Sequence, residues 1–332
     1  MRNVVLYLES TGMWAQENRV KYDFLLSPDV FPISKYWEDQ LARFATTLRK
    51  YFTGKVGTFP ALCKVDIMVD RNGQLKVAEV DGLNKRALGY AILQRRIAML
   101  FGHDTERFFS GNEHALKRLL AGKTLFVIAP GREKYYRFGF DILIEALRSL
   151  EVEAAWGHEK SAVRFLREAD PEQTVLLDAP STGHKECDEQ ISRGWKVLIP
   201  NQSFFSSKAN LVGLESPLVP RTLSGIVNPV PFERYVAKHV GRSGCKGVYF
   251  DDETHSMSPG DYIVQELVEA GEFELSHFDK RSQLTKSGGW KVRLIVTLNL
   301  VDSQVVDVDV TACKGRLVHG MAESIQIAGV RQ

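Results

Sequence analysis

Two patterns of hydrophobic residues mark the first third of the chain. Apolar residues recur every three to four positions between Trp37 and Phe52, the period of one helical face, and Ser34 stands just ahead as a candidate N-cap. Further on, strand-like runs at 61–69 and 74–80 flank a turn that ends in Asn-Gly, a dipeptide that supplies the positive φ angles of a tight hairpin. The same reasoning predicts a strand at 4–8, a loop with two prolines at 27–32, and a helix at 91–101.

Between residues 123 and 200 the pattern changes to short apolar runs separated by amphipathic segments. This alternation predicts a parallel sheet covered by helices on both faces, as in a small Rossmann-like domain. No GxGxxG follows the first run, so no dinucleotide site is assigned. The predicted strands are 124–129, 152–156, 174–177 and 195–199, and the predicted helices are 138–150, 159–168 and 184–193.

After residue 201 long alternating runs predict an antiparallel layer. Linkers are expected near 102–122 and 200–230, so the chain is predicted to be a mixed α/β protein with several units. The strand candidates are 235–239, 262–267, 292–300 and 305–310.

Composition and charge narrow the class of protein. Of the 332 residues, 44% are hydrophobic and 25% are charged, which excludes a disordered or collagen-like chain. The 43 Lys and Arg barely exceed the 41 Asp and Glu, so no basic excess attracts nucleic acid. The first apolar run is too short for a signal peptide or a membrane span, and the four cysteines form no CxxC pair. We therefore expect a cytoplasmic protein with reduced thiols.

Three carboxylates fall on the predicted hairpin. Asp66 lies on its first strand, whereas Glu79 and Asp81 lie two residues apart on the second and therefore share a face. Strand pairing can place Asp66 opposite them, and grouped carboxylates repel one another unless a hard cation such as Mg²⁺ lies among them. The alternative is a solvated polar face that stands opposite the apolar residues Val65, Ile67, Val77 and Val80.

A lysine precedes a glycine-rich loop in the last third of the chain. Lys238 lies in a predicted strand, and glycines at 241, 244 and 247 follow before the next strand begins at Val248. Backbone N–H groups of such a loop can close on phosphate oxygens, and the lysine adds a positive charge. The pattern also occurs in ordinary surface hairpins, and it differs from the strand-to-helix pattern GxxxxGK[ST].

Two further segments have residues that suit a nucleotide. The apolar run 263–268, followed by Gly271 and Glu272, can offer backbone groups to a base and a carboxylate to ribose hydroxyls, although it is equally compatible with an edge strand. Arg293 stands among apolar residues of a predicted strand, where its charge needs a partner. That partner is either a phosphate or a structural carboxylate.

Taken together, these segments resemble the ATP-grasp ligases. That family has a lysine before a glycine-rich loop, then a hinge, an arginine on a strand, and a D…ExN metal motif. The segments that correspond here are Lys238, 241–247, 264–268, Arg293 and Asp66…Glu79-Val80-Asp81.

The resemblance extends to one more pair of segments and has two departures. Ile199-Pro200-Asn201 with Ser207-Lys208-Ala209 is similar to the Asn and Lys that the family has before its central domain. Asp81 replaces the usual Asn and adds a negative charge, and the segment 82–86 matches no known ligase.

The order of the motifs is unusual for this family. The metal hairpin precedes the Rossmann-like part, so the chain resembles a circularly permuted ATP-grasp protein, the class that includes glutathionylspermidine synthase-like ligases. The first and last units would then build one active site, and the chain termini would lie near each other. The implied units are 1–110 with the metal hairpin, 120–200 as a Rossmann-like pre-ATP-grasp domain, and 201–332 as the nucleotide-binding part.

The resemblance implies an ATP-dependent carboxylate-amine ligase that forms an amide or peptide bond through an acyl phosphate. Its cofactors would be ATP and Mg²⁺, and its partners a small-molecule or peptide carboxylate and an amine acceptor. No nucleic acid or membrane is implied, and a homodimer is left open. The implied roles are Mg²⁺ binding by Asp66, Glu79 and Asp81, phosphoryl stabilisation by Arg293, and nucleotide binding by Lys208, Lys238, Gly244, Gln265, Leu267 and Glu272.

Two other functions are compatible with the same residues. One is a catalytically silent nucleotide-binding protein. The chain retains three acidic residues, two lysines and one arginine of the candidate site, and this argues against a loss of catalysis. The other is an ATP-grasp kinase without an amine acceptor, which amine-dependent ATP turnover would distinguish from a ligase.

Overall fold

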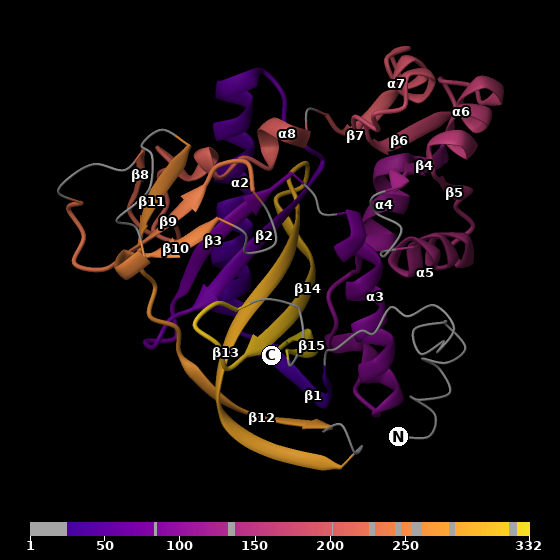
Figure 1. Ribbon diagram of the computed structural model, residues 1–332. Helices are drawn as coiled ribbons and strands as arrows, with labels where there is room; N and C mark the ends of the chain where they lie inside the picture. The colour runs from indigo at the N-terminus through magenta and orange to yellow at the C-terminus, as the bar shows by residue number, and fades with distance from the viewer. Residues whose placement is uncertain are drawn as a thin grey trace.

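The central element of the fold is a seven-stranded sheet whose strands come from both ends of the chain (Figure 1). Six strands follow the order β1-β15-β14-β13-β2-β3, and β12 pairs with β13. The strands are β1 Leu25–Ile33, β2 Leu62–Val69, β3 Leu75–Asp81, β12 Glu272–Phe278, β13 Leu284–Asn299, β14 Gln304–Cys313 and β15 Ile325–Arg331. The computed structural model describes residues 25–82, 85–131, 137–200, 202–225, 230–242, 247–253, 261–278, 283–318 and 324–332.

Helix α2 (Lys35–Val56) covers the apolar face of this sheet, and its ends form as the sequence predicts. The Ser34 hydroxyl accepts a hydrogen bond from the backbone N–H of Trp37 (3.2 Å), which satisfies one of the free donors of the first turn. Gly57 ends the helix in the left-handed conformation, with φ at 73°. The buried face of the helix belongs to the same apolar core as the inward residues of β2, β13 and β14.

A β-bulge in β3 decides which residues of the hairpin share a face. Asp66 pairs with Glu79, but beyond this pair the register shifts by one, so Ala78 is an extra residue. The bulge lets Val77 and Val80, which are three residues apart, both point into the core. A regular strand cannot do this, because its side chains alternate between the two faces. The predicted hairpin is therefore confirmed, and the bulge explains how Val77 and Val80 share its apolar face.

The hairpin turn differs from the expected Asn-Gly turn. Gly73 has a positive φ (72°), and Asn72 is not among the residues with positive φ. Instead, Asp70 Oδ1 accepts hydrogen bonds from the backbone N–H groups of Asn72 and Gln74, both at 2.8 Å. The side chain of Asp70 thus stabilises the turn, which the Asn-Gly dipeptide was expected to form by its backbone conformation.

Strand β1 occupies a segment that was predicted as a loop because of its two prolines. It pairs in parallel with β15, and its register is irregular between Leu26 and Val30, around the first proline. Proline has no backbone N–H to donate to a neighbouring strand. Because β1 is at the end of the strand order, this missing hydrogen bond costs little stability. The strand predicted at 4–8 lies outside the described residues.

A second, antiparallel sheet has the order β10-β9-β11-β8 and lies beside the hairpin (Figure 1). The predicted strands 235–239 and 262–267 correspond to β9 and β11. A short helix α8 (Gln202–Phe205) and a 3₁₀ turn (Lys208–Leu211) precede this sheet in the chain. Its strands are β8 Thr222–Ser224, β9 Tyr235–His239, β10 Val248–Phe250 and β11 Tyr262–Glu266.

The third sheet is parallel, as the alternation of strands and helices predicts, with the order β5-β4-β6-β7. Alternate residues of β4 belong to two different apolar clusters, one shared with α5 and the other with α6, so both faces are covered. The elements are β4 Thr124–Ile128, α5 Arg137–Ser149, β5 Ala154–Gly157, α6 Glu159–Glu168, β6 Thr174–Asp178, α7 Lys185–Ile191 and β7 Lys196–Ile199. Its assignment as a Rossmann-like domain stays a prediction.

Helices α3 (Lys85–Leu100) and α4 (Asn112–Leu120) join the parallel sheet to the large one. Their buried residues share an apolar cluster with β4, with α5 and with Val306 of β14. Helix α3 begins six residues before the predicted helix, and α4 occupies a segment that was expected to be a linker. None of the helices in the described part of the chain combines the length and apolar character needed to cross a membrane.

Candidate functional site

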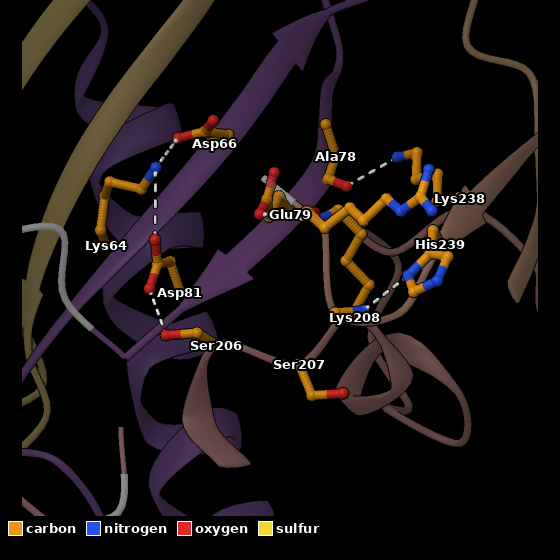
Figure 2. A network of polar contacts seen from close by, with 12 residues as sticks. Lys64, Asp66, Ala78, Glu79, Asp81, Ser206, Ser207, Lys208, Lys238 and His239 are labelled. Atoms are coloured by element: carbon orange, nitrogen blue, oxygen red, sulfur yellow. Dashed lines mark hydrogen bonds and ion pairs between the residues drawn. The ribbon is translucent and has the colours of Figure 1, made fainter. Parts of the chain in front are cut away.

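Seven charged side chains meet where the bulged hairpin faces β13 and the antiparallel sheet. Figure 2 labels all of them except Arg293. Strand alternation and the bulge place four of them on one face of β2 and β3, and the other three come from β13, from β9 and from the 3₁₀ turn after α8. We call this group the charged cluster: Lys64, Asp66, Glu79, Asp81, Lys208, Lys238 and Arg293.

Asp66 lies at the buried centre of the cluster, with its side chain 5% exposed. Lys64 Nζ lies 3.1 Å from its Oδ1, and an Nη1–Oδ2 contact of 3.2 Å pairs it with Arg293. Burial alone would raise the pKa of Asp66, but the two cations outweigh burial and lower it. The charge of Arg293 is thus met by a structural carboxylate, one of the two partners that the sequence left open.

Lys64 is a member of the site that sequence reasoning missed. Its Nζ also lies 3.8 Å from Asp81 Oδ2, so the ammonium stands between two carboxylates (Figure 2). Burial lowers the pKa of Lys64, but Asp66 and Asp81 raise it to about 12. Its spacing could have identified it, because a residue two positions before Asp66 shares its face in a strand.

Ser206 is the second residue that the sequence did not indicate. Its hydroxyl donates a hydrogen bond to Asp81 Oδ1 (2.5 Å) and accepts one from the backbone N–H of Gly82 (3.3 Å). These contacts fix Asp81 against the segment that leads to Lys208. Ser206 and Asp81 are 125 positions apart in the chain, so no local sequence pattern predicts their hydrogen bond.

Lys208 and Glu79 connect this segment to the hairpin. Lys208 Nζ lies 3.2 Å from Glu79 Oε1 and also donates a hydrogen bond to the backbone carbonyl of Arg242. The Lys208 side chain is almost fully buried, whereas that of Glu79 is 25% exposed, the most of the three carboxylates. Glu79 is therefore the carboxylate that an incoming ligand reaches most easily.

The bulge also explains the position of Lys238. Its Nζ donates a hydrogen bond to the carbonyl of Ala78, the extra residue of β3, at 2.7 Å. It donates a second one to Oε1 of Gln265 on β11, at 2.6 Å, and the Gln265 amide donates to the hydroxyl of Thr222. The side chains of Lys238 and Gln265 therefore bind each other and hold the antiparallel sheet against the hairpin.

The other predicted nucleotide contacts are not part of this group. The backbone N–H of Leu267 donates to the carbonyl of Arg234 (3.0 Å). Glu272 begins β12 and lines a separate hollow of about 470 Å³ beside the hairpin turn, and it has no ion pair with the charged cluster among the described residues. Gly244 lies outside the described residues. Roles for these three residues stay predictions.

The predicted metal ligands differ in how well they fit a hard divalent cation. Within the described ranges, no three His, Cys, Asp or Glu side chains are grouped so that they could hold a metal ion. Both oxygens of Asp66 face cations of the chain itself, whereas Glu79 and Asp81 are more exposed and Asp81 Oδ2 has only a long contact with Lys64, at 3.8 Å. Two carboxylates and phosphate oxygens suffice for one Mg²⁺, which commonly keeps several waters.

Comparison with known proteins finds similarity among solved structures. No protein-family model matches the chain, and no curated protein is significantly similar to it. The solved structure of a glutathione synthetase-like effector from Globodera pallida, in its apo form, aligns over 99% of both chains with a TM-score of 0.54 and 13% identity. At that identity the match shows a common fold and nothing finer.

A second solved structure is more distant. It is that of a protein described as a gamma-glutamylcysteine synthetase from Methylobacillus flagellatus, with a TM-score of 0.41 and 13% identity. The alignment covers 84% of this chain and 81% of that chain, and a likeness of this degree carries no argument.

Proposed function

We propose that the protein is an ATP-dependent carboxylate-amine ligase built on a circularly permuted ATP-grasp fold. One observation carries the proposal: three cations from separate segments converge on the hairpin. Lys208 pairs with Glu79, Arg293 pairs with Asp66, and Lys238 binds the backbone carbonyl of Ala78 beside them. A cluster with cations on several sides of two reachable carboxylates suits a metal-bound triphosphate. The fold shared with a glutathione synthetase-like effector agrees with the motif resemblance in the sequence.

The permutation is part of this proposal. Residues 1–110 would supply the metal hairpin, 120–200 the Rossmann-like domain, and 201–332 the nucleotide loop and the arginine strand. The pairing of β2 with β13 supports it, because Asp66 and Arg293 become neighbours although 227 positions separate them.

In the proposed reaction, a substrate carboxylate attacks the γ-phosphorus of ATP and ADP leaves. The amine then attacks the acyl carbon, and inorganic phosphate leaves. Mg²⁺, when bound, neutralises phosphate charge, and Glu79 and Asp81 are the residues that fit it. Lys208 and Lys238 would exchange their partners inside the protein for phosphate oxygens, and Arg293, oriented by Asp66, would stabilise the transferred phosphoryl group.

The test of the proposal is whether ATP turnover needs both an acid and an amine. We expect phosphate release from ATP and Mg²⁺ when panels of amino acids, short peptides and polyamines supply both groups, and little release with either class alone. Glu79→Gln should retain the thermal unfolding midpoint of the wild type but lose about 10²-fold or more in turnover. Release with an acid alone would favour a kinase, and full activity of Glu79→Gln would contradict the assigned site.

A further inference from the structure

The position between Asp66 and Asp81 is already filled by a cation that belongs to the chain. Lys64 Nζ lies 3.1 Å from Asp66 Oδ1 and 3.8 Å from Asp81 Oδ2, and its side chain is only 10% exposed. A Mg²⁺ that bridged the same two carboxylates would need oxygens at about 2.1 Å, in the space that this ammonium occupies. Figure 2 shows the lysine reaching back between the two side chains.

The second oxygen of Asp66 is no more available than the first. Arg293 pairs with Oδ2 at 3.2 Å, and the register of β2 with β13 holds the arginine there. A metal ion at Asp66 would have to displace Lys64 or Arg293, and a displaced Arg293 would lose its ion pair in a largely desolvated place. Asp66 therefore serves as the anchor of Lys64 and Arg293.

Glu79 and Asp81 are placed differently from Asp66. Their side chains are 25% and 18% exposed, and among the described residues each forms one ion pair, Glu79 with Lys208 at 3.2 Å and Asp81 with Lys64 at 3.8 Å. Lys208 is also the residue that the proposed function assigns to phosphate, so a nucleotide that binds it releases Glu79. These two carboxylates are enough for one ion that completes its coordination with phosphate oxygens and water.

We propose that the Lys64 ammonium takes the place of a second divalent cation, so that the site binds a single metal ion per nucleotide, through Glu79 and Asp81. The inference rests on the proposed function for the presence of a nucleotide. It departs from the three-carboxylate metal site that the sequence implies, because Asp66 is assigned to the two cations of the chain.

The experiment counts bound metal ions with Mn²⁺ as the probe. Electron paramagnetic resonance of free Mn²⁺ would be measured for the full chain, with and without a non-hydrolysable ATP analogue. We expect one tightly bound Mn²⁺ per wild-type chain with the analogue, and one additional Mn²⁺ in Lys64→Met, because the substitution frees oxygens of Asp66 and Asp81. Methionine keeps the length and apolar stem of the lysine, and Asp66 keeps Arg293 as a partner.

Two control variants isolate the charge of Lys64. Lys64→Arg retains a cation and should keep the wild-type count. Lys76→Met is the same substitution on the same hairpin, at a lysine that donates a hydrogen bond to the Pro217 carbonyl (3.4 Å) and does not belong to the charged cluster, and it should also leave the count unchanged.

Each outcome decides one of the two proposals. Two tight Mn²⁺ ions in the wild type would overturn the inference whether or not Lys64→Met folds, and so would a folded Lys64→Met that gains no ion. Failure of the wild type to bind the analogue would speak against the proposed function. In that case the number of Mn²⁺ ions bound without the analogue is compared between the wild type and Lys64→Met. The additional ion expected in Lys64→Met needs only Asp66 and Asp81, so this comparison still tests the role of Lys64.

Discussion

Among single residues, Asp309 of β14 is a buried carboxyl that forms no ion pair with the described part of the chain. It is 5% exposed, and within the described structure its Oδ1 has no hydrogen-bond partner. Burial, together with the nearby charge of Asp307, raises its pKa to about 7. Folding therefore favours the protonated form of this side chain.

This raised pKa predicts how stability changes with pH. Because the folded chain holds the proton more tightly than the unfolded chain, the contribution of Asp309 is present at low pH and is lost as the pH rises from about 4 to about 7, by up to about 1.4 kcal/mol per unit. Asp309→Asn stays neutral, so its free energy of unfolding should exceed that of the wild type by on the order of 4 kcal/mol at pH 8 and approach it near pH 4. Urea denaturation at both pH values measures the difference, with exposed Asp261→Asn as control. An equal difference at the two pH values would contradict the assignment.

At the scale of elements, the contact between α3 and α5 depends on a glycine. A Cβ built on Gly89 of α3 would lie 1.9 Å from the carbonyl oxygen of Gly139 on α5, so the two backbones touch directly. These helices hold the parallel sheet against β14, and their buried residues belong to one apolar cluster. A larger residue at Gly89 must therefore push the helices apart.

Alanine at this glycine should destabilise the protein, although alanine ordinarily favours a helix. We expect Gly89→Ala to cost about 2–4 kcal/mol, because overpacking against backbone cannot be relieved by a side-chain movement. Gly54→Ala on α2 is the matched control: nothing lies within 4 Å of its Cβ, and the higher helix propensity should stabilise by about 0.5–1 kcal/mol. Chemical denaturation of both variants measures these changes. A Gly89→Ala protein as stable as the wild type would show that the helices can separate freely.

At the scale of the whole molecule, the large sheet joins segments from opposite ends of the chain. β2 pairs with β13 over seven residues, and β1 pairs in parallel with β15. Helix α2, which precedes β2, covers the apolar face of strands that come more than 200 positions later. Neither end of the chain can complete the sheet or the charged cluster alone.

A fragment of residues 120–332 should therefore lack a stable sheet. Without β2 and α2, β13 loses a partner strand and its apolar face becomes exposed, so we expect no cooperative thermal unfolding by circular dichroism. The fragment also lacks Glu79 and Asp81, so calorimetry should detect no binding of a Mg²⁺-bound ATP analogue that the full chain binds. A fragment that hydrolysed ATP at the rate of the full chain would contradict both the shared site and the proposed permutation.

The elements that sequence alone predicted are those with a local cause. Helix α2 follows from an apolar period and a serine cap, the hairpin from two alternating runs around a turn, and the parallel sheet from regular alternation of strands and helices. β1 was missed because its two prolines indicate a loop, and only the parallel partner β15 and the edge position make it a strand. Such long-range pairing leaves no trace in a local pattern.

The same division applies to the candidate site. The pattern along the chain predicts that Asp66, Glu79, Asp81, Lys238 and Arg293 are charged residues on strands, and the resemblance adds Lys208. Their partners follow from packing: the strand register sets Glu79 opposite Asp66, and β13 brings Arg293 to Asp66. Packing also placed Lys64 between two carboxylates that the sequence had assigned to a metal. The physical reason is that charge pairing depends on distances of a few ångströms, which strand register and packing set and which spacing along the chain does not contain.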